Sequence, residues 1–243
     1  MIAVAARSGQ LFNASSVAND IDVDYKTVQA WTSILQASGI IRVIHPFWPN
    51  TGKRLTKTPK VYFMDTGLVC HLTRWNTPDQ LRNGTVAGHV FEAFVVSEVL
   101  KSYMNAGANL RDVWFYRDSK KREIDLVIQD GHTLHPVEIK TNALVRKDAV
   151  KNFGCLEGMA GYEVGFGHVV CQTREPYLLT FMRMADAKVA LPVNVSEPRC
   201  SLELPTESRK VKFFLGDVGM LTYKCGMDVV RDLALSRRGD VVL

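Results

Sequence analysis

The amino-acid sequence predicts an α/β protein with an N-terminal winged helix, followed by an α/β sandwich around a mixed sheet. Residues 1–80 carry two helix patterns and then a basic hairpin. Residues 81–193 alternate helix and strand patterns. Residues 194–243 open with a loop-like stretch and then become apolar again. The middle part therefore has the order of elements that builds a sandwich, and the other two parts flank it.

The first part is predicted to be a winged helix. The polar stretch 13–16 starts a helix, because apolar residues follow it at helical spacing. Asp24 is a typical N-cap for a second, longer helix, which Gly39 ends. Residues 40–44 and 60–63 then predict two strands. Two helices with a tight connection and a following hairpin make this arrangement.

The winged helix offers two surfaces to nucleic acid. Its second helix would enter the major groove, and the basic loop of the hairpin would hold phosphates. The alternative is a winged helix that docks a protein partner and whose charges are only solvated. Charge distribution alone leaves both interpretations open. The candidate DNA-binding residues are Lys26, Thr27 and Gln29 on the helix and Lys53, Arg54 and Lys57 in the loop, where Lys60 adds a fourth positive charge.

The middle part is expected to form a long apolar helix and a mixed sheet. Residues 89–103 are strongly apolar and predict the helix. Residues 123–129 and 133–140 predict two strands, with Gly131 in the turn of the hairpin. The other expected elements are a strand at 113–117, a helix at 149–159 and short strands at 167–171 and 178–182.

Four polar side chains on these apolar elements suit phosphodiester chemistry. Asp125 lies within one predicted strand, and Glu138 and Lys140 lie two residues apart on the next, so that they point to one face. Glu92 is a carboxylate on the apolar helix. Carboxylates can hold one or two Mg²⁺ ions, and a lysine can orient water or stabilise charge on a phosphate. The four residues therefore predict a nuclease-type catalytic site, with Glu92, Asp125 and Glu138 as metal ligands.

Each of these residues also has a plainer interpretation. A Glu-x-Lys pair on a strand, such as Glu138 and Lys140, is commonly a solvated surface pair. This interpretation is harder for Asp125 and Glu92, since an unpaired buried carboxylate is costly. Whether a metal site formed by these residues acts in catalysis is a separate question, which the residue pattern leaves open.

Two sets of residues resemble known families. Ile124-Asp125, twelve intervening residues and Glu138-Ile139-Lys140 look like the PD-(D/E)xK signature of restriction-endonuclease-like proteins, with Ile124 in place of the proline. The second set consists of the segments AARSGQL (5–11), TVQAW (27–31), GKRL (52–55), KTPKVYFMDTGL (57–68) and GHVFE (88–92). Over residues 1 to about 193 the chain is similar to the C-terminal region of bacterial and archaeal AAA-type ATPases with the domain of unknown function 4143. The resemblance implies a winged helix before a restriction-endonuclease-like domain, with Glu92, Asp125, Glu138 and Lys140 at nuclease-like positions.

The chain differs from that family pattern in two ways. Such proteins normally carry an AAA-type ATPase domain before the winged helix, whereas this chain has no GxxxxGK(S/T) loop. An ATPase domain is therefore expected to act in trans. Residues 212–221 also parallel residues 60–69, as if a second family unit began there and stopped at Leu243. The tail is expected to be a truncated remnant or, alternatively, an ordinary strand and helix packed on the body.

Composition narrows the partners and the compartment. The net charge of +5 permits a nucleic-acid partner but does not require one. The five cysteines form no CxxC pair and follow no secretory signal, which favours thiols in the cytoplasm. No apolar run reaches the roughly 18 residues that span a bilayer, so no membrane partner is expected. We expect a nuclease-like, DNA-associated region with a Mg²⁺ site. The alternatives are a non-catalytic docking module of an ATPase, or a fragment without independent activity.

Overall fold

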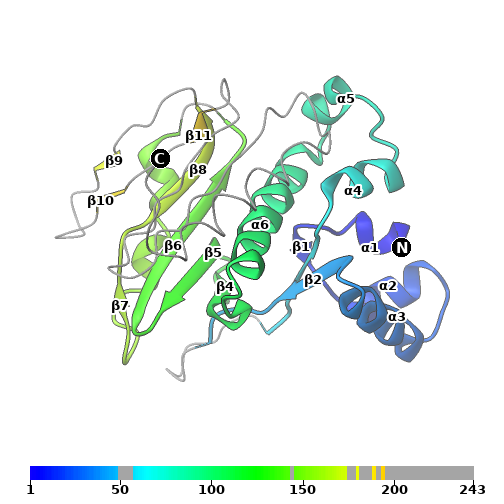
Figure 1. Cartoon of the computed structure of the whole chain (residues 1–243), viewed down its shortest axis with the longest axis horizontal. Helices are drawn as coiled ribbons and strands as arrows, with labels where there is room; N and C mark the ends of the chain where they lie inside the picture. The colour runs from blue at the N-terminus through cyan, green and yellow to red at the C-terminus, as the bar shows by residue number, and fades with distance from the viewer. Residues whose placement is uncertain (49–56, 143–144, 174–178, 181–187, 190–192, 195–243) are drawn as a thin grey trace.

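The computed structural model describes residues 1–48, 57–142, 145–173, 179–180, 188–189 and 193–194 (Figure 1). It contains N-terminal helices, a long central helix and a mixed sheet, which confirms the predicted α/β class. The long helix lies between the N-terminal helices and the sheet (Figure 1).

The N-terminal part combines short helices with a three-stranded antiparallel sheet. Its elements are α1 (Ile2–Ala5), β1 (Gln10–Leu11), α2 (Ala14–Asp20), α3 (Tyr25–Ala37), β2 (Ile41–Ile44) and β3 (Lys60–Phe63). The central strand β3 pairs antiparallel with β1 on one side and with β2 on the other. This is the arrangement of a winged helix. The sequence prediction did not include α1 and β1, because such short elements leave no periodic pattern.

Side-chain caps fix the starts of α2 and α3. Asn13 Oδ1 accepts hydrogen bonds from the backbone N–H groups of Ser15 at 2.9 Å and Ser16 at 3.2 Å. Asp24 Oδ2 accepts from the N–H of Thr27 at 3.2 Å. These carbonyl and carboxylate oxygens satisfy donors that have no partner within the first turn of a helix. Both predicted helix starts are confirmed.

Three helices lead from the winged helix to the sheet: α4 (Thr66–Leu72), α5 (Pro78–Asn83) and α6 (Ala87–Asn105). Asp65 caps α4 and Thr77 caps α5. The predicted helix over 89–103 is confirmed as α6, which is longer at both ends. Because α6 is covered on two sides, it is apolar around most of its circumference.

Gly9 lies at the contact between the winged helix and α6. Its φ is +78°, and a Cβ at this position would lie 2.8 Å from the backbone oxygen of His89. We expect Gly9→Ala to lower the free energy of unfolding by about 2–4 kcal/mol, because backbone strain and a backbone clash both oppose it. Gly39→Ala is the matched control, since Gly39 has a φ of +72° but nothing within 4 Å. The control should cost about 1–2 kcal/mol. Urea denaturation measures both, and equal losses would contradict the close contact.

The mixed sheet has the order β11-β8-β6-β5-β4. β4 (Val113–Arg117), β5 (Glu123–Asp130) and β6 (Thr133–Lys140) form an antiparallel meander, and β8 (His168–Thr173) runs parallel to β6. The predicted hairpin is therefore confirmed. The remaining elements are the 3-10 helices η1 (Leu110–Asp112), η2 (Lys147–Val150) and η3 (Phe153–Cys155) and the strands β7 (Glu163–Val164), β9 (Leu179–Thr180), β10 (Lys188–Val189) and β11 (Val193–Asn194).

The helix predicted over 149–159 is wrong. Two short 3-10 helices, η2 and η3, occupy this stretch and its start. Gly154 and Gly158 disfavour a continuous helix, since each glycine inside a helix costs about 1 kcal/mol, and Gly158 has a φ of +70°. The strand predicted over 178–182 is present at residues 179–180, where β9 pairs with β10 instead of the larger sheet.

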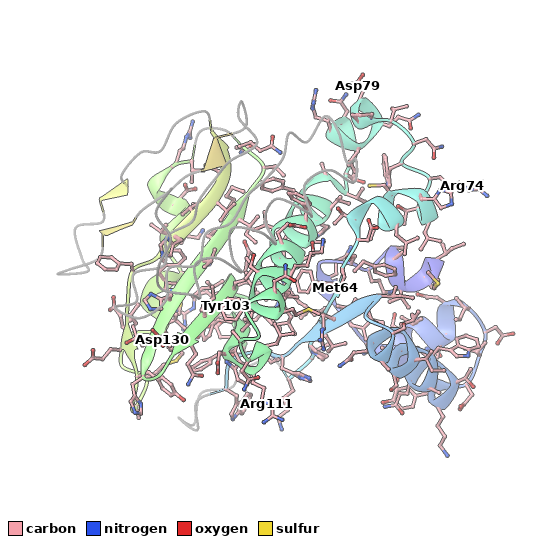
Figure 2. The ribbon with its side chains drawn as sticks, viewed as in Figure 1. Met64, Arg74, Asp79, Tyr103, Arg111 and Asp130 are labelled. Atoms are coloured by element: carbon pink, nitrogen blue, oxygen red, sulfur yellow. The ribbon has the colours of Figure 1, made fainter. Side chains whose placement is uncertain are left out.

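One hydrophobic core joins the winged helix to the sheet through α6. It combines Tyr62 and Met64 from the N-terminal part with Phe91 and other residues of α6 and with Leu126 of β5. Tyr103, which is labelled with the core residue Met64 in Figure 2, packs against this core.

The predicted domain boundary at residue 80 stays a prediction. The predicted sequence parallel between residues 212–221 and residues 60–69 falls partly outside the described residues, because residues 212–221 are not among them. In the described part of the chain, every helix is too short or too polar to span a membrane.

Candidate functional site

The β5–β6 hairpin brings three of the predicted site residues together. The pairing of β5 with β6 ends at Leu126 and Val137, and Asp125 and Glu138 are the next residues on the two strands. Lys140 follows Glu138 by two residues and shares its face. Asp125 and Glu138 are only 9% and 7% exposed. They are buried because β5 and β6 are interior strands, with α6 packed against β6.

Asp125 is a buried carboxyl group that accepts a short hydrogen bond from the backbone. Its Oδ2 accepts from the backbone N–H of Ile139 at 2.7 Å. Burial, and next the charge of Glu92, raise the pKa of Asp125 to about 7. These two effects outweigh the opposing charges of Lys60 and Lys140. The positive charges near Asp125 are therefore too weak to offset the cost of burying its ionised carboxylate.

Glu138 has one engaged and one unengaged oxygen. Its Oε1 lies 2.5 Å from Nζ of Lys140, whereas its buried Oε2 has no hydrogen-bond partner among the described residues. Burial, and next the charge of Asp125, raise the pKa of Glu138 to about 7. A buried acceptor without a donor costs about 1–3 kcal/mol. Oε2 is therefore a candidate ligand for a cation.

Lys140 places an ammonium group beside this pair. Burial lowers the pKa of Lys140, but the charges of Glu138, Asp125 and Glu92 outweigh burial and raise it. Its side chain is 41% exposed, in contrast to the 9% of Glu138. Lys140 therefore stays charged and reaches from the buried pair toward solvent.

Glu92 faces the same cluster from α6, but its carboxylate is already engaged. Its Oε1 accepts from Nζ of Lys60 and from the hydroxyl of Tyr62, both at 2.7 Å. The charge of Glu92 also contributes to the raised pKa of Asp125. All four predicted residues therefore lie around one site, with Glu92 bound to residues of the winged helix.

Lys60 and Glu123 belong to this site, although the sequence analysis did not place them there. Nζ of Lys60 lies 2.5 Å from Oε1 of Glu123, and Glu123 also pairs with Arg117. Burial lowers the pKa of Lys60, but the charges of Glu92, Glu123 and Asp125 outweigh burial and raise it. The sequence did carry a signal for Glu123, since it precedes Asp125 by two residues and shares its face.

The three predicted metal ligands do not form a complete ligand set. Within residues 1–48, 57–142, 145–173 and the short strands after them, no group of three His, Cys, Asp or Glu side chains is placed to hold a metal ion. Asp125 and Glu138 are neighbours on the hairpin, whereas Glu92 is held by Lys60 and Tyr62. The geometry offers a pair of carboxyl groups, and Glu92 Oε1 would have to give up Lys60 and Tyr62 to become a third ligand.

The candidate DNA-binding residues of α3 lie outside this cluster. Lys26 and Gln29 are exposed, and Thr27 is half-buried, with its N–H in the helix cap. The same helix exposes Trp31 to 48% and Ile34 to 63%. Apolar side chains are typical of a protein-docking surface, and exposed polar ones suit DNA. Both interpretations of the winged helix therefore stay open.

The basic loop of the hairpin is described only at its end. Lys57 is exposed, and its Nζ lies 5.6 Å from the centre of the Trp48 ring. Lys53 and Arg54 lie outside the described residues. Lys60 is the first residue of β3 and only 2% exposed. Its assignment to a phosphate-binding wing is wrong, because a buried ammonium paired with carboxylates cannot reach a DNA backbone.

Two protein-family models match the chain, one over its N-terminal part and one over its middle part. Residues 87–189 match the model of a domain of unknown function, DUF4143. This confirms the DUF4143 part of the resemblance. Residues 1–79 match a second domain of unknown function, DUF8612. The DUF4143 region contains Glu92, Asp125, Glu138 and Lys140, whereas Lys60 belongs to the DUF8612 region.

Two mycobacterial proteins are similar to part of the chain. They are the uncharacterized proteins Rv2008c of Mycobacterium tuberculosis and Mb2031c of Mycobacterium bovis, each 27% identical over 132 residues. Each match covers 54% of this chain and 29% of the relative. The chain thus spans less than a third of the length of these relatives. No solved structure matches it.

Proposed function

We propose that the DUF4143 region is a nuclease-like, DNA-associated domain whose Asp125, Glu138 and Lys140 hydrolyse phosphodiester bonds with Mg²⁺. The observation that carries the proposal is the buried Asp125–Glu138 pair. Both carboxyl groups have raised pKa values, and Glu138 Oε2 has no partner among the described residues. Two neighbouring buried carboxyl groups are costly to ionise unless a proton or a cation compensates their charge.

The order of elements supports the proposal. Helix α6 is followed by the antiparallel strands β4, β5 and β6 and then by β8, parallel to β6. The sequence predicted a helix, three strands, a second helix and a further strand. The structure has this order except that the 3-10 helices η2 and η3 stand in place of the second helix.

Asp125 and Glu138 fit a Mg²⁺ ion by the chemistry of their donors. Mg²⁺ prefers oxygen ligands and keeps several waters, so that one or two carboxylates suffice. Glu138 Oε2 has unused acceptor capacity, and cation binding would offset the cost of its burial. Mg²⁺ bound there would polarise a phosphoryl oxygen and lower the pKa of a water.

Other side-chain and backbone groups of the chain would bind the phosphate, orient the water and position the carboxylates. Lys140 uses one N–H for Glu138 and keeps others, which can donate to a phosphate oxygen or orient a water. The N–H of Ile139 fixes the orientation of Asp125. Lys60 and Tyr62 hold Glu92, so that it contributes negative charge near the pair.

Cleavage of supercoiled plasmid tests this function. We expect nicking in Mg²⁺ that is lost with EDTA and falls at least about 100-fold in Glu138→Gln and Lys140→Met, since each variant removes a group acting on the phosphate or the water. Lys101→Met is the matched control, because Lys101 pairs with Glu98 on the surface of α6. Equal, negligible cutting by all four proteins would contradict the proposal. Parallel DNA and RNA substrates identify the nucleic acid.

The second candidate function is a non-catalytic module that docks DNA or a partner, including an AAA-type ATPase domain in trans. The exposed Trp31 and Ile34 of α3 favour a docking role. An electrophoretic shift against increasing salt separates DNA from protein docking. Phosphate-driven binding should be strongest at low salt and weaker in a Lys26→Ala, Lys57→Ala double variant than in Lys101→Ala. Absence of retardation at low salt would count against DNA association.

A further inference from the structure

We propose that Lys60 is the built-in cation of the candidate site. By holding Glu92 and Glu123 it limits the site to one divalent cation, on Asp125 and Glu138. This inference rests on the proposed function and deepens it, because it names how many ions the site takes and which residue of the winged helix sets that number.

The ammonium group of Lys60 is buried and lies close to two carboxylates and an aromatic ring. Its side chain is 3% exposed. Its Nζ lies 2.7 Å from Glu92 Oε1 and 2.5 Å from Glu123 Oε1, and 5.5 Å from the centre of the Phe115 ring. Burying an ammonium group is costly unless opposite charges surround it. The two carboxylates and the ring face supply that surrounding.

The winged helix delivers a second donor to the same carboxylate. Tyr62 follows Lys60 by two residues on β3, so both side chains point to one face. The Tyr62 hydroxyl donates to the same Oε1 of Glu92 that Lys60 contacts. This oxygen therefore has two donors at hydrogen-bond distance, and a metal that used it would have to compete with both.

The balance of charge supports a single divalent ion. Lys60, Arg117 and Lys140 face four carboxyl groups of the cluster, which are Glu92, Glu123, Asp125 and Glu138. When all are ionised, one negative charge is in excess, and one divalent ion already reverses that sign. A second ion would have to share Glu92 with the Lys60 ammonium, and like charges at such short range repel strongly.

Removal of Lys60 should therefore release ligands. In Lys60→Met, Glu92 and Glu123 would lose their ammonium partner, and the excess of negative charge in the ionised cluster would rise from one to two, because Arg117 and Lys140 remain. Divalent cations should then bind at a second position or at least about tenfold more tightly. Lys60→Arg keeps the positive charge and should bind cations like the unchanged chain.

Manganese is the probe, because calorimetry gives its stoichiometry and electron paramagnetic resonance counts free Mn²⁺ without any activity assay. The full chain should bind one Mn²⁺. Lys60→Met should gain a second ion or tenfold affinity, and Lys101→Met should change neither. Glu92→Gln should keep one ion, since Glu92 is not a ligand while Lys60 holds it, and should bind it more weakly because a negative charge near the pair is lost.

Two results would overturn the inference: Lys60→Met binding Mn²⁺ like the unchanged chain, or Glu92→Gln losing the ion. If Lys60→Met does not fold, Mn²⁺ binding by Glu92→Gln alone tests the inference. Failure of the proposed function would be seen differently. Either Asp125→Asn would bind Mn²⁺ as tightly as the unchanged chain, or neither of these two proteins would bind Mn²⁺. A gain in Lys60→Met against a non-binding parent would then support the role of Lys60 alone.

Discussion

Replacing Asp125 by Asn is expected to stabilise the metal-free protein at pH 8 by on the order of 3 kcal/mol. The fold raises the pKa of Asp125 from its ordinary 3.8 to about 7. Such a group favours the folded state below its unfolded pKa, and this contribution is lost as the pH rises through 7. Asparagine removes the buried charge and can still accept from Ile139.

Urea denaturation in EDTA between pH 4 and pH 8 measures this effect. The unchanged chain should lose stability relative to Asp125→Asn across this window. Asp79→Asn is the control, because Asp79 is an exposed carboxylate on α5 (Figure 2). A constant difference between the unchanged chain and Asp125→Asn over the whole window would contradict the raised pKa.

Replacing Lys60 by Met is expected to lower the free energy of unfolding by about 3–5 kcal/mol in EDTA. The change leaves Glu92 and Glu123 without their shared ammonium group. Water compensates this loss poorly, because the Lys60 side chain is buried. Lys101→Met should cost less than about 1 kcal/mol, since the Lys101 side chain is 41% exposed.

Chemical denaturation of both lysine variants at pH 7 measures the difference. Equal losses would mean that the Lys60 ion pairs contribute no more than a surface pair. Loss of stability in Lys60→Met that Mn²⁺ partly restores is the expected combined result, because the cation then binds the folded state preferentially.

The parts of the site that lie on one hairpin could be predicted from the sequence. Asp125, Glu138 and Lys140 are separated by short distances along the chain, and strand alternation gives their facing directions. The caps at Asn13 and Asp24 are likewise local, since each contacts residues two or three positions away.

The rest of the site depends on contacts between distant segments. Lys60 and Glu92 are 32 residues apart, and their contact arises from the way β3 packs against α6. A lysine near a basic loop is indistinguishable in sequence from one that faces DNA. The failed helix at 149–159 has a local cause, because Gly154 and Gly158 disfavour it more than its apolar spacing favours it.

Calorimetric titration of the full chain with Mg²⁺ is the most direct test of the Asp125–Glu138 site. One ion per chain should bind, and Asp125→Asn and Glu138→Gln should each abolish the heat, while Lys101→Met retains it. Absence of binding by the unchanged chain, or equal heat in all four proteins, would contradict a divalent-cation site at this pair.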